Sequence, residues 1–293
     1  MVKLISSLLQ TKFILVLIYF ICNSYPSFSN EKLIISSIPD ESLSELSTKF
    51  KPLVDYLKKE LFIDIEFVPV TDYSAVVEAL VNEKVHLAWL GGFTFVQASI
   101  RSNDNIIPII QRKKDQKFRS VFITHKSSSI NNINELKNKN FSFGSPSSTS
   151  GHLMPRYFLM KQGIEVDTFF KRIAYSGAHD ATIFSVLSRK VDGGVLNELV
   201  WEKFKQKNKK LTEKLKIVSK TKPYFDYNWS ILKSVDKTLR EKLINAFLKL
   251  SKENDFERNI LQLQRAEGFI PTYKKNYEKI KTIAIDTGLI ELN

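Results

Sequence analysis

Cysteine, long apolar runs and common catalytic motifs are scarce or missing in this sequence of 293 residues. Its one cysteine, Cys22, excludes a disulfide framework and any metal cluster held by several cysteines. The most apolar segment, Phe13–Cys22, covers ten residues, whereas a membrane-spanning helix needs about 20. A disulfide-stapled scaffold and a polytopic membrane protein are therefore both excluded.

Short motifs of several enzyme classes are also missing. The sequence contains no GxGxxG, no P-loop GxxxxGK, no GxSxG and no HExxH. Its four histidines, His86, His125, His152 and His179, are not spaced like zinc ligands. We therefore expect a protein that is not an enzyme and that uses no metal or organic cofactor.

Positive charge is in excess, but little of it is arginine. The formal charge is +13, and only nine of the 44 basic residues are arginine, the side chain that best reads phosphates and bases. Lysine-rich runs such as Lys203–Lys210 are typical of a solvated helix face. Because no nucleic-acid motif accompanies the charge, we expect surface lysines and no nucleic-acid partner.

The first 29 residues have the pattern of an export signal. Two lysines accompany the run FILVLIYFIC, and Ser27 and Ser29 place small residues at −3 and −1 of a cut before Asn30. An uncleaved anchor helix is the alternative, but the short apolar core favours cleavage. A lipoprotein start at Cys22 is disfavoured by the bulky Ile21 before it. Cleavage would leave an exported chain with no cysteine and a formal charge of +11.

Strand and helix patterns alternate along the rest of the chain. Strands are predicted at Leu33–Ile38, Ile63–Val68 and Val85–Leu90, with helices over Ser42–Leu61 and from Tyr73. This β-α-β order predicts an α/β fold with a largely parallel sheet and helices on both faces.

The same pattern restarts after His125. Strands at Phe141–Gly144 and Gly193–Leu196 alternate with helices at Leu153–Gln162 and Glu198–Lys207. No flexible linker separates the two halves, which indicates two α/β lobes with a cleft between them.

A serine-rich loop is the strongest local indication of a binding site. Gly144–His152 (GSPSSTSGH) follows a predicted strand and opens a predicted helix. Free N–H groups at a helix N-terminus attract anions, and Ser148, Thr149 and Ser150 add hydroxyl donors. The alternative is an ordinary helix cap with polar padding. The strand–loop–helix setting favours an anion site.

Two further strand-to-helix turns have similar chemistry, Thr71–Tyr73 and Ser176–Asp180. Such turns gather at the carboxyl ends of strands. The alternative is that Asp72 and Asp180 each only cap a helix. A partly protonated oxyanion also carries an O–H, for which Asp72, Asp180 or Asp226 could be the acceptor. His179 is expected to donate a hydrogen bond to the anion rather than to activate a serine, because its side chain and that of Asp180 diverge.

At these residues the sequence resembles the periplasmic substrate-binding proteins of phosphate/phosphite/phosphonate ABC transporters, the PhnD-like family. The likeness is nearest to the phosphite-binding branch, although some relatives with the GGxTxVQA segment are labelled selenate binders. The matching segments span most of the exported chain in order: IPDESLSEL (38–46), VPVTDYSAVVEAL (68–80), LAWLGGFTFVQA (87–98), FGSPSSTSGHLMPRYFL (143–159), YSGAHDATI (175–183), VDGGVLNELVW (191–201) and FDYNWS (225–230).

The resemblance implies a two-lobed periplasmic binding protein fold of type II, with the ligand cleft between the lobes. Two hinge crossings are expected, near Thr124–Lys126 and near Pro223–Asn228. The implied division is 1–29 signal peptide, 30–124 plus 226–293 first lobe, and 125–225 second lobe.

The resemblance also implies the binding residues. Ser148, Thr149 and Ser150 would hold the anion's oxygens, and Tyr73 would add a hydroxyl or ring contact. Further hydrogen bonds and the wall of the first lobe would come from His179, Asp226, Asp180, Trp89, Gly91, Gly92 and Thr94.

One position departs from the aminophosphonate binders of the family. Leu199 stands where a carboxylate for a substrate amine is expected, with Glu198 one residue away. The expected ligand is therefore a small anion such as phosphite or methylphosphonate. The resemblance implies a periplasmic monomer that serves an ABC permease and its ATPase subunit. Two alternatives stay open: an enzyme on the same fold, as in thiamine-pyrimidine synthesis, and an anion-sensing partner of a membrane kinase.

Overall fold

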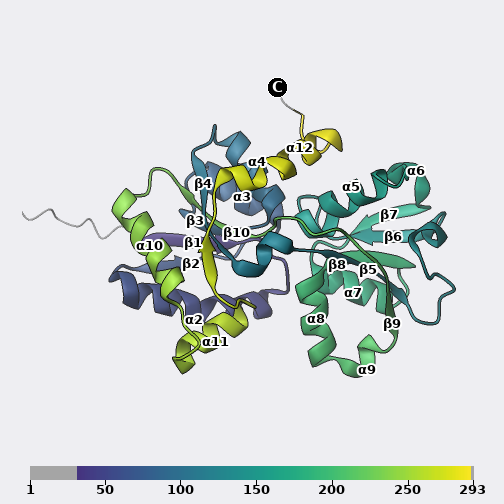
Figure 1. Cartoon of the computed structure of the whole chain (residues 1–293), viewed down its shortest axis with the longest axis horizontal. Helices are drawn as coiled ribbons and strands as arrows, with labels where there is room; N and C mark the ends of the chain where they lie inside the picture. Colours follow the sequence, from purple (N-terminus) through teal and green to yellow (C-terminus); the bar gives the residue numbers. More distant parts are fainter. Residues whose placement is uncertain (1–31, 292–293) are drawn as a thin grey trace, which may run out of the picture. The chain divides into compact units, whose positions relative to one another are not determined.

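The computed structural model describes residues 32–291, and the predicted signal peptide lies outside them. Within these residues the strands form one six-stranded and one five-stranded sheet, each covered by helices (Figure 1). The first sheet has the order β11-β4-β10-β3-β1-β2. Its strands are β1 (Leu33–Ser37), β2 (Ile65–Phe67), β3 (Leu87–Leu90), β4 (Ile106–Arg112), β10 (Asn228–Leu232) and β11 (Phe269–Pro271).

The second sheet has the order β7-β6-β8-β5-β9. We call each sheet with its helices a lobe, the first and the second. The strands of the second sheet are β5 (Ser120–His125), β6 (Asn140–Phe143), β7 (Arg172–Tyr175), β8 (Gly193–Asn197) and β9 (Leu215–Lys220). This two-sheet α/β arrangement is the fold class that the sequence predicts.

Helices follow most strands in both lobes, as the apolar spacing predicts. In α2, for example, Leu46, Phe50, Leu53 and Leu57 are buried at i, i+4, i+7 and i+11, which is one face of a helix. The first lobe contains α2 (Leu43–Leu61), α3 (Tyr73–Val81), α4 (Gly92–Arg101), α10 (Lys237–Lys249), α11 (Asp255–Leu263) and α12 (Glu278–Asp286). The second contains α5 (Met154–Met160), α6 (Val166–Phe169), α7 (His179–Leu187), α8 (Glu198–Lys207) and α9 (Lys209–Thr212).

Both sheets are mixed, although most of their strands run parallel. In the first sheet β10 is antiparallel to β3 and β4, and β11 is antiparallel to β4. In the second sheet β5 is antiparallel to β8 and β9. β5 and β10 are the first strands that the chain forms after it passes from one sheet to the other. A parallel pair of consecutive strands in one sheet needs a crossover connection, usually an α-helix. The chain enters β5 and β10 directly from the other sheet, without such a helix.

The first crossing between the lobes differs from the predicted one. We expected it near Thr124–Lys126, but β5 pairs from Ser120 onward with β8 and β9, so the chain enters the second sheet before Ser120. The two crossings are residues 113–119 and 221–227, between the last strand of one sheet and the first of the next. They pair at Phe118 and Tyr224, whose N–H groups donate to each other's carbonyls at 2.8 and 3.0 Å.

Candidate functional site

The predicted binding residues of both lobes meet where strands end and helices begin. The backbone N–H of Phe93, in the first turn of α4, donates to Thr149 Oγ1 of the second lobe at 2.9 Å. Gly91 allows this approach, because a Cβ there would lie 2.8 Å from Thr149 Oγ1. Tyr73, Ser148, Thr149, Ser150, His179 and Asp226 are each at most 2% exposed, so the site is closed off from solvent.

The serine-rich loop is both a helix cap and a source of donors. Ser148 Oγ accepts the N–H of Gly151 at 2.9 Å, and the turn over Thr149–Leu153 is a π-helix that continues into α5. The N–H of Gly144 in turn donates to the carbonyl of Gly151 at 2.8 Å. The first N–H groups of a helix have no intrahelical acceptor, so the capped turn points donors toward the site.

Tyr73 contributes a buried hydroxyl. It is the first residue of α3, and it lies beside the Ser148 side chain. Its hydroxyl has no hydrogen-bond partner among the described residues. Burial and the carboxylate of Asp40 raise the pKa of Tyr73 well above its usual value, so the group is a neutral O–H that can donate.

Asp226 is a buried carboxyl group on the return crossing. Its N–H donates to the carbonyl of Asp115 on the outgoing crossing at 2.9 Å, and its Oδ1 accepts the N–H of Gly92 at 3.0 Å. Its Oδ2 has no partner among the described residues. Burial raises the pKa of Asp226 to about 7, against the opposing effects of the Gly92 N–H and the Thr149 hydroxyl.

His179, at the start of α7, is completely buried and neutral. Burial lowers its pKa to about 4, although the carboxylates of Asp40 and Glu41 act in the opposite direction. Nδ1 accepts the N–H of Asn197 at 3.4 Å, which leaves the ring proton on Nε2. Nε2 lies 3.5 Å from the hydroxyl of Tyr227, so His179 presents a single donor between the serine loop and that tyrosine.

The residues predicted to form the wall of the first lobe have the following contacts. The Trp89 ring stacks on Tyr227 at 5.1 Å between centroids, and the Arg112 guanidinium lies 4.8 Å from the Trp89 ring centre. Gly92 supplies its N–H to Asp226. The hydroxyl of Thr94, by contrast, donates to the carbonyl of Gly91 at 2.9 Å and so stabilises the start of α4.

The three candidate carboxylates have different surroundings. Asp72 is an exposed cap of α3 that accepts the N–H of Ala75 at 2.9 Å. Asp180 accepts N–H groups with both oxygens, from Ser42 at 3.1 Å and from Ala181 at 2.8 Å. Asp226 therefore combines full burial with an oxygen that has no partner, which is what an acceptor for a ligand O–H requires.

Other residues near the site are missing from the prediction. Lys49 of α2 is 4% exposed, and its Nζ lies 3.7 Å from Oδ1 of Asp40. Burial lowers the pKa of Lys49 to about 8, which the nearby Asp40 partly offsets. Asn197 donates from Nδ2 to the hydroxyl of Tyr227 at 2.7 Å. A lysine on the otherwise apolar face of a predicted helix is the signal that could have revealed Lys49.

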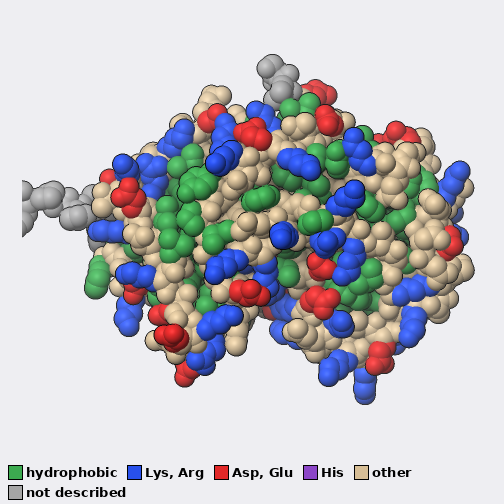
Figure 2. Space-filling model, viewed as in Figure 1, with side chains coloured by type: hydrophobic (Ala, Val, Ile, Leu, Met, Phe, Trp, Pro, Cys, Tyr) green, Lys and Arg blue, Asp and Glu red, His purple; other side chains and the backbone are tan. Residues whose placement is uncertain are grey.

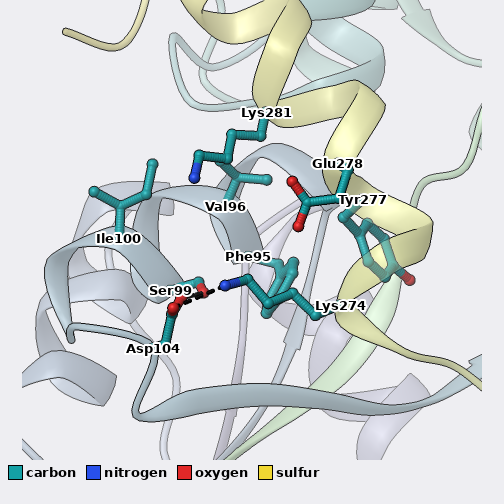
Figure 3. A pocket seen from close by; sticks show the side chains of 9 residues that line it. All are labelled: Phe95, Val96, Ser99, Ile100, Asp104, Lys274, Tyr277, Glu278 and Lys281. Atoms are coloured by element: carbon teal, nitrogen blue, oxygen red, sulfur yellow. Dashed lines mark hydrogen bonds and ion pairs between the residues drawn. The ribbon is translucent and has the colours of Figure 1, made fainter. Parts of the chain in front are cut away.

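The pocket between α4 and α12 is too small for the predicted anion, and the surface charge is not gathered at one place. The pocket between α4 and α12 has a volume of about 20 Å³, close to that of a single water site, and the Lys274–Asp104 ion pair at 2.8 Å crosses it (Figure 3). On the face drawn in Figure 2, lysine and arginine side chains are spread over both lobes among acidic ones. The net charge is thus carried largely by scattered surface residues.

Two α/β lobes, two chain crossings and buried polar groups between the lobes define the class of two-lobed solute-binding proteins. Residues 35–277 match the family model described as ABC transporter, phosphonate, periplasmic substrate-binding protein. The chain belongs to this family, and it is a substrate-binding protein of an ABC transporter of the phosphonate/phosphite class.

Individual relatives agree with this assignment. The chain is 36% identical to the probable ABC transporter phosphite binding protein PhnD1 of Prochlorococcus marinus (strain MIT 9301), over 89% of this chain and 91% of that protein. The structure of PhnD1 in complex with methylphosphonate superposes with a TM-score of 0.86 and 34% identity, covering 89% of this chain and 100% of the other. The phosphonates-binding periplasmic protein of Escherichia coli (strain K12) is 27% identical, over 77% of this chain and 68% of its own length.

The family consists of periplasmic binding proteins and not of enzymes. Between residues 32 and 291, no helix is both long and apolar enough to cross a membrane.

Proposed function

We propose that this protein binds a small phosphorus oxyanion, phosphite or methylphosphonate, between its lobes. The observation that carries the proposal is a pair of buried groups, the Tyr73 hydroxyl and Asp226 Oδ2, beside the capped turn Thr149–Leu153. Neither has a hydrogen-bond partner in the part of the chain that the structure describes. Both groups have hydrogen-bonding capacity that a protonated oxyanion would satisfy. PhnD1, which is named for phosphite and has a structure with methylphosphonate, supports the choice of ligand.

The site is suited to an anion that still holds one proton. The Tyr73 hydroxyl, the Nε2–H of His179 and the hydroxyls of Ser148, Thr149 and Ser150 would donate to its oxygens. Asp226 Oδ2 would accept from the remaining P–O–H, or would itself carry the proton. A fully ionised anion beside ionised Asp226 would meet like charge in a buried setting, where repulsion is strong.

An apolar substituent on phosphorus fits the aromatic wall. The P–H or P–CH₃ group makes no conventional hydrogen bond, so contact with the rings of Trp89 and Tyr227 costs it little. Phosphate would place a hydroxyl there without a partner, at a cost of about 1–3 kcal/mol. The single side-chain ion pair of Glu198 goes to Lys220 at 2.7 Å, and Leu199 offers no carboxylate, which disfavours ligands with an amine.

We further propose that the chain is exported by cleavage of residues 1–29, acts as a monomer, and delivers the anion to an ABC permease driven by its ATPase subunit. Family membership supports delivery to such a transporter.

Isothermal titration calorimetry of the purified protein would test the ligand. Phosphite and methylphosphonate should bind at least tenfold more tightly than phosphate or 2-aminoethylphosphonate, as a loss of about 1.4 kcal/mol implies. Selenate serves as a control anion without phosphorus. Tighter binding of selenate, or no heat with any phosphorus oxyanion, would overturn the proposal.

A further inference from the structure

The segment Asp40–Glu45, between β1 and the first turn of α2, contacts the second lobe at several points, some beside the proposed anion site and some away from it. The N–H of His179 donates to the carbonyl of Asp40 at 3.1 Å. The N–H of Ser42 donates to Asp180 Oδ2 at 3.1 Å. These two bonds join the start of α2 to the start of α7.

A cluster of ion pairs reinforces this junction. Lys203 of α8 lies in the second lobe, and its Nζ is 2.6 Å from Glu41 Oε2 and 2.7 Å from Glu45 Oε2, both in the first lobe. Lys207 contacts Glu45 at 3.2 Å, and Arg265 contacts Glu41 from within the first lobe. We call Glu41, Glu45, Lys203 and Lys207 the interlobe ion-pair cluster.

The cluster is partly withdrawn from water. Glu41 is 4% exposed and the Lys203 side chain 22% exposed. Burial raises the pKa of Glu41, but Arg265, Lys49 and Lys203 outweigh it and bring the pKa down to about 2, so Glu41 is ionised. On one side the cluster borders a groove of about 390 Å³ that Lys49 and Lys203 both help to line. Opening the lobes would leave Glu41 with Arg265, but it would separate Lys203 from both of its carboxylates.

We propose that Lys203 is a positioning residue that holds the lobes together and so sets how long the anion stays bound, without touching it. This role rests on the proposed function, because it supposes an anion enclosed by lobe closure. The contacts of Lys203 with Glu41 and Glu45 form only when the lobes meet, so their loss should speed ligand release. Ligand entry into the open form should be unaffected.

The variant Lys203→Gln tests this role, with Lys205→Gln as the matched control. Lys205 lies on the same helix, is 58% exposed, and pairs within the second lobe with Glu202 at 3.6 Å. For methylphosphonate, stopped-flow measurement should show the dissociation rate of Lys203→Gln raised about five- to thirtyfold, with the association rate unchanged. Lys205→Gln should match the wild type. Lys203→Arg should restore most of the slow release, which a merely structural defect would not allow.

Equal dissociation rates in Lys203→Gln and Lys205→Gln would overturn the role of Lys203. The radius of gyration without ligand, from small-angle scattering, gives a separate readout. It should be larger for Lys203→Gln than for the control, since fewer molecules would have their lobes closed. If the wild type binds no phosphorus oxyanion, the proposed function fails. The scattering comparison then tests the role of Lys203 by itself, and equal radii of gyration in Lys203→Gln and Lys205→Gln would overturn that role.

Discussion

Two individual residues in the proposed anion site each keep a buried polar atom that has no hydrogen-bond partner among residues 32–291. They are the hydroxyl of Tyr73 and Oδ2 of Asp226. A buried polar atom without a hydrogen bond costs about 1–3 kcal/mol. These atoms therefore lower the stability of the free protein, and an anion that hydrogen-bonds to them would restore it.

Removing the Tyr73 hydroxyl should weaken binding without harming the fold. In Tyr73→Phe the ring stays in place, and a buried hydroxyl without a partner disappears. We expect the affinity for methylphosphonate to fall about ten- to a hundredfold, as for a hydrogen bond to a charged group. The melting temperature of the free protein should stay the same or rise. Calorimetric titration and thermal unfolding measure the two effects.

Tyr56→Phe is the matched control. The Tyr56 hydroxyl is buried and donates to the carbonyl of Ala246 at 2.9 Å, away from the anion site. Its loss should lower the melting temperature and leave affinity unchanged. A Tyr73→Phe variant that binds as well as the wild type would remove Tyr73 from the site.

Asp226 should make the free protein less stable as the pH rises. Its pKa in the folded protein is about 7, compared with an ordinary value of 3.8. Between these two values the folded state holds more protons than the unfolded state, so stability falls with increasing pH. His179 has the opposite effect, because its pKa is lowered to about 4 and the unfolded state takes up the proton first.

The variant Asp226→Asn isolates the carboxyl contribution, since asparagine does not titrate and can still accept the Gly92 N–H. The effect of His179 is common to both proteins and cancels. The unfolding free energy of the variant relative to the wild type should rise from pH 4 to pH 7, the interval that the Asp226 pKa defines. A constant difference across this interval would show that Asp226 titrates normally.

At the scale of elements, the turn Thr149–Leu153 depends on two glycines packed together. A Cβ on Gly151 would lie 2.9 Å from Ser148 Oγ, 3.1 Å from the Cα of Gly144 and 3.2 Å from Cε1 of His179. The loop can bring its donors close to His179 only because these positions lack side chains. The same glycines shape both the cap and the proposed anion site.

Gly151→Ala should therefore impair both folding and binding. Forced packing of this kind costs about 1–3 kcal/mol of unfolding free energy. Because Ser148 and His179 must shift, affinity should fall as well. Gly163→Ala is the control, since Gly163 has φ +74° and no heavy atom within 4 Å of a new Cβ. It should lower stability through backbone strain and leave affinity unchanged, and equal affinities in the two variants would contradict this account.

Local patterns in the sequence predict much of this arrangement. Helical spacing locates α2 and α8, and the loop Gly144–His152 is correctly placed between a strand and a helix. The sheet to which a strand belongs is a different matter, because the apolar pattern of Ser120–His125 is the same in either sheet. The first crossing was therefore misplaced by one strand.

Partnerships between distant residues are the other part that local patterns do not predict. Lys49 and Asp40 pair across the junction of β1 and α2, and Lys203 meets Glu41 across 162 positions of sequence. Apart from Lys49, which falls on the apolar face of a predicted helix, these side chains have the sequence pattern of ordinary surface charges. Only the folded chain shows that they are buried or half-buried and paired.

At the scale of the whole molecule, the net positive charge should act on the rate of association. The exported chain would carry +11, mostly as lysine, and a field of this sign attracts anions over distances that salt shortens. Stopped-flow tryptophan fluorescence should show the association rate with methylphosphonate falling as sodium chloride increases. A rate independent of salt would show that the surface charge plays no part in capture.

The two crossings lie side by side where Phe118 and Tyr224 pair, and Asp226 follows two residues later on the return crossing. A rotation of the lobes about these segments would therefore turn the backbone next to the proposed ligand acceptor. A membrane partner that pulls the lobes apart would at the same moment disturb the carboxyl group that we propose as the acceptor of the anion's proton. Lobe opening and anion release would thus occur together, and a partly opened protein would not retain its ligand.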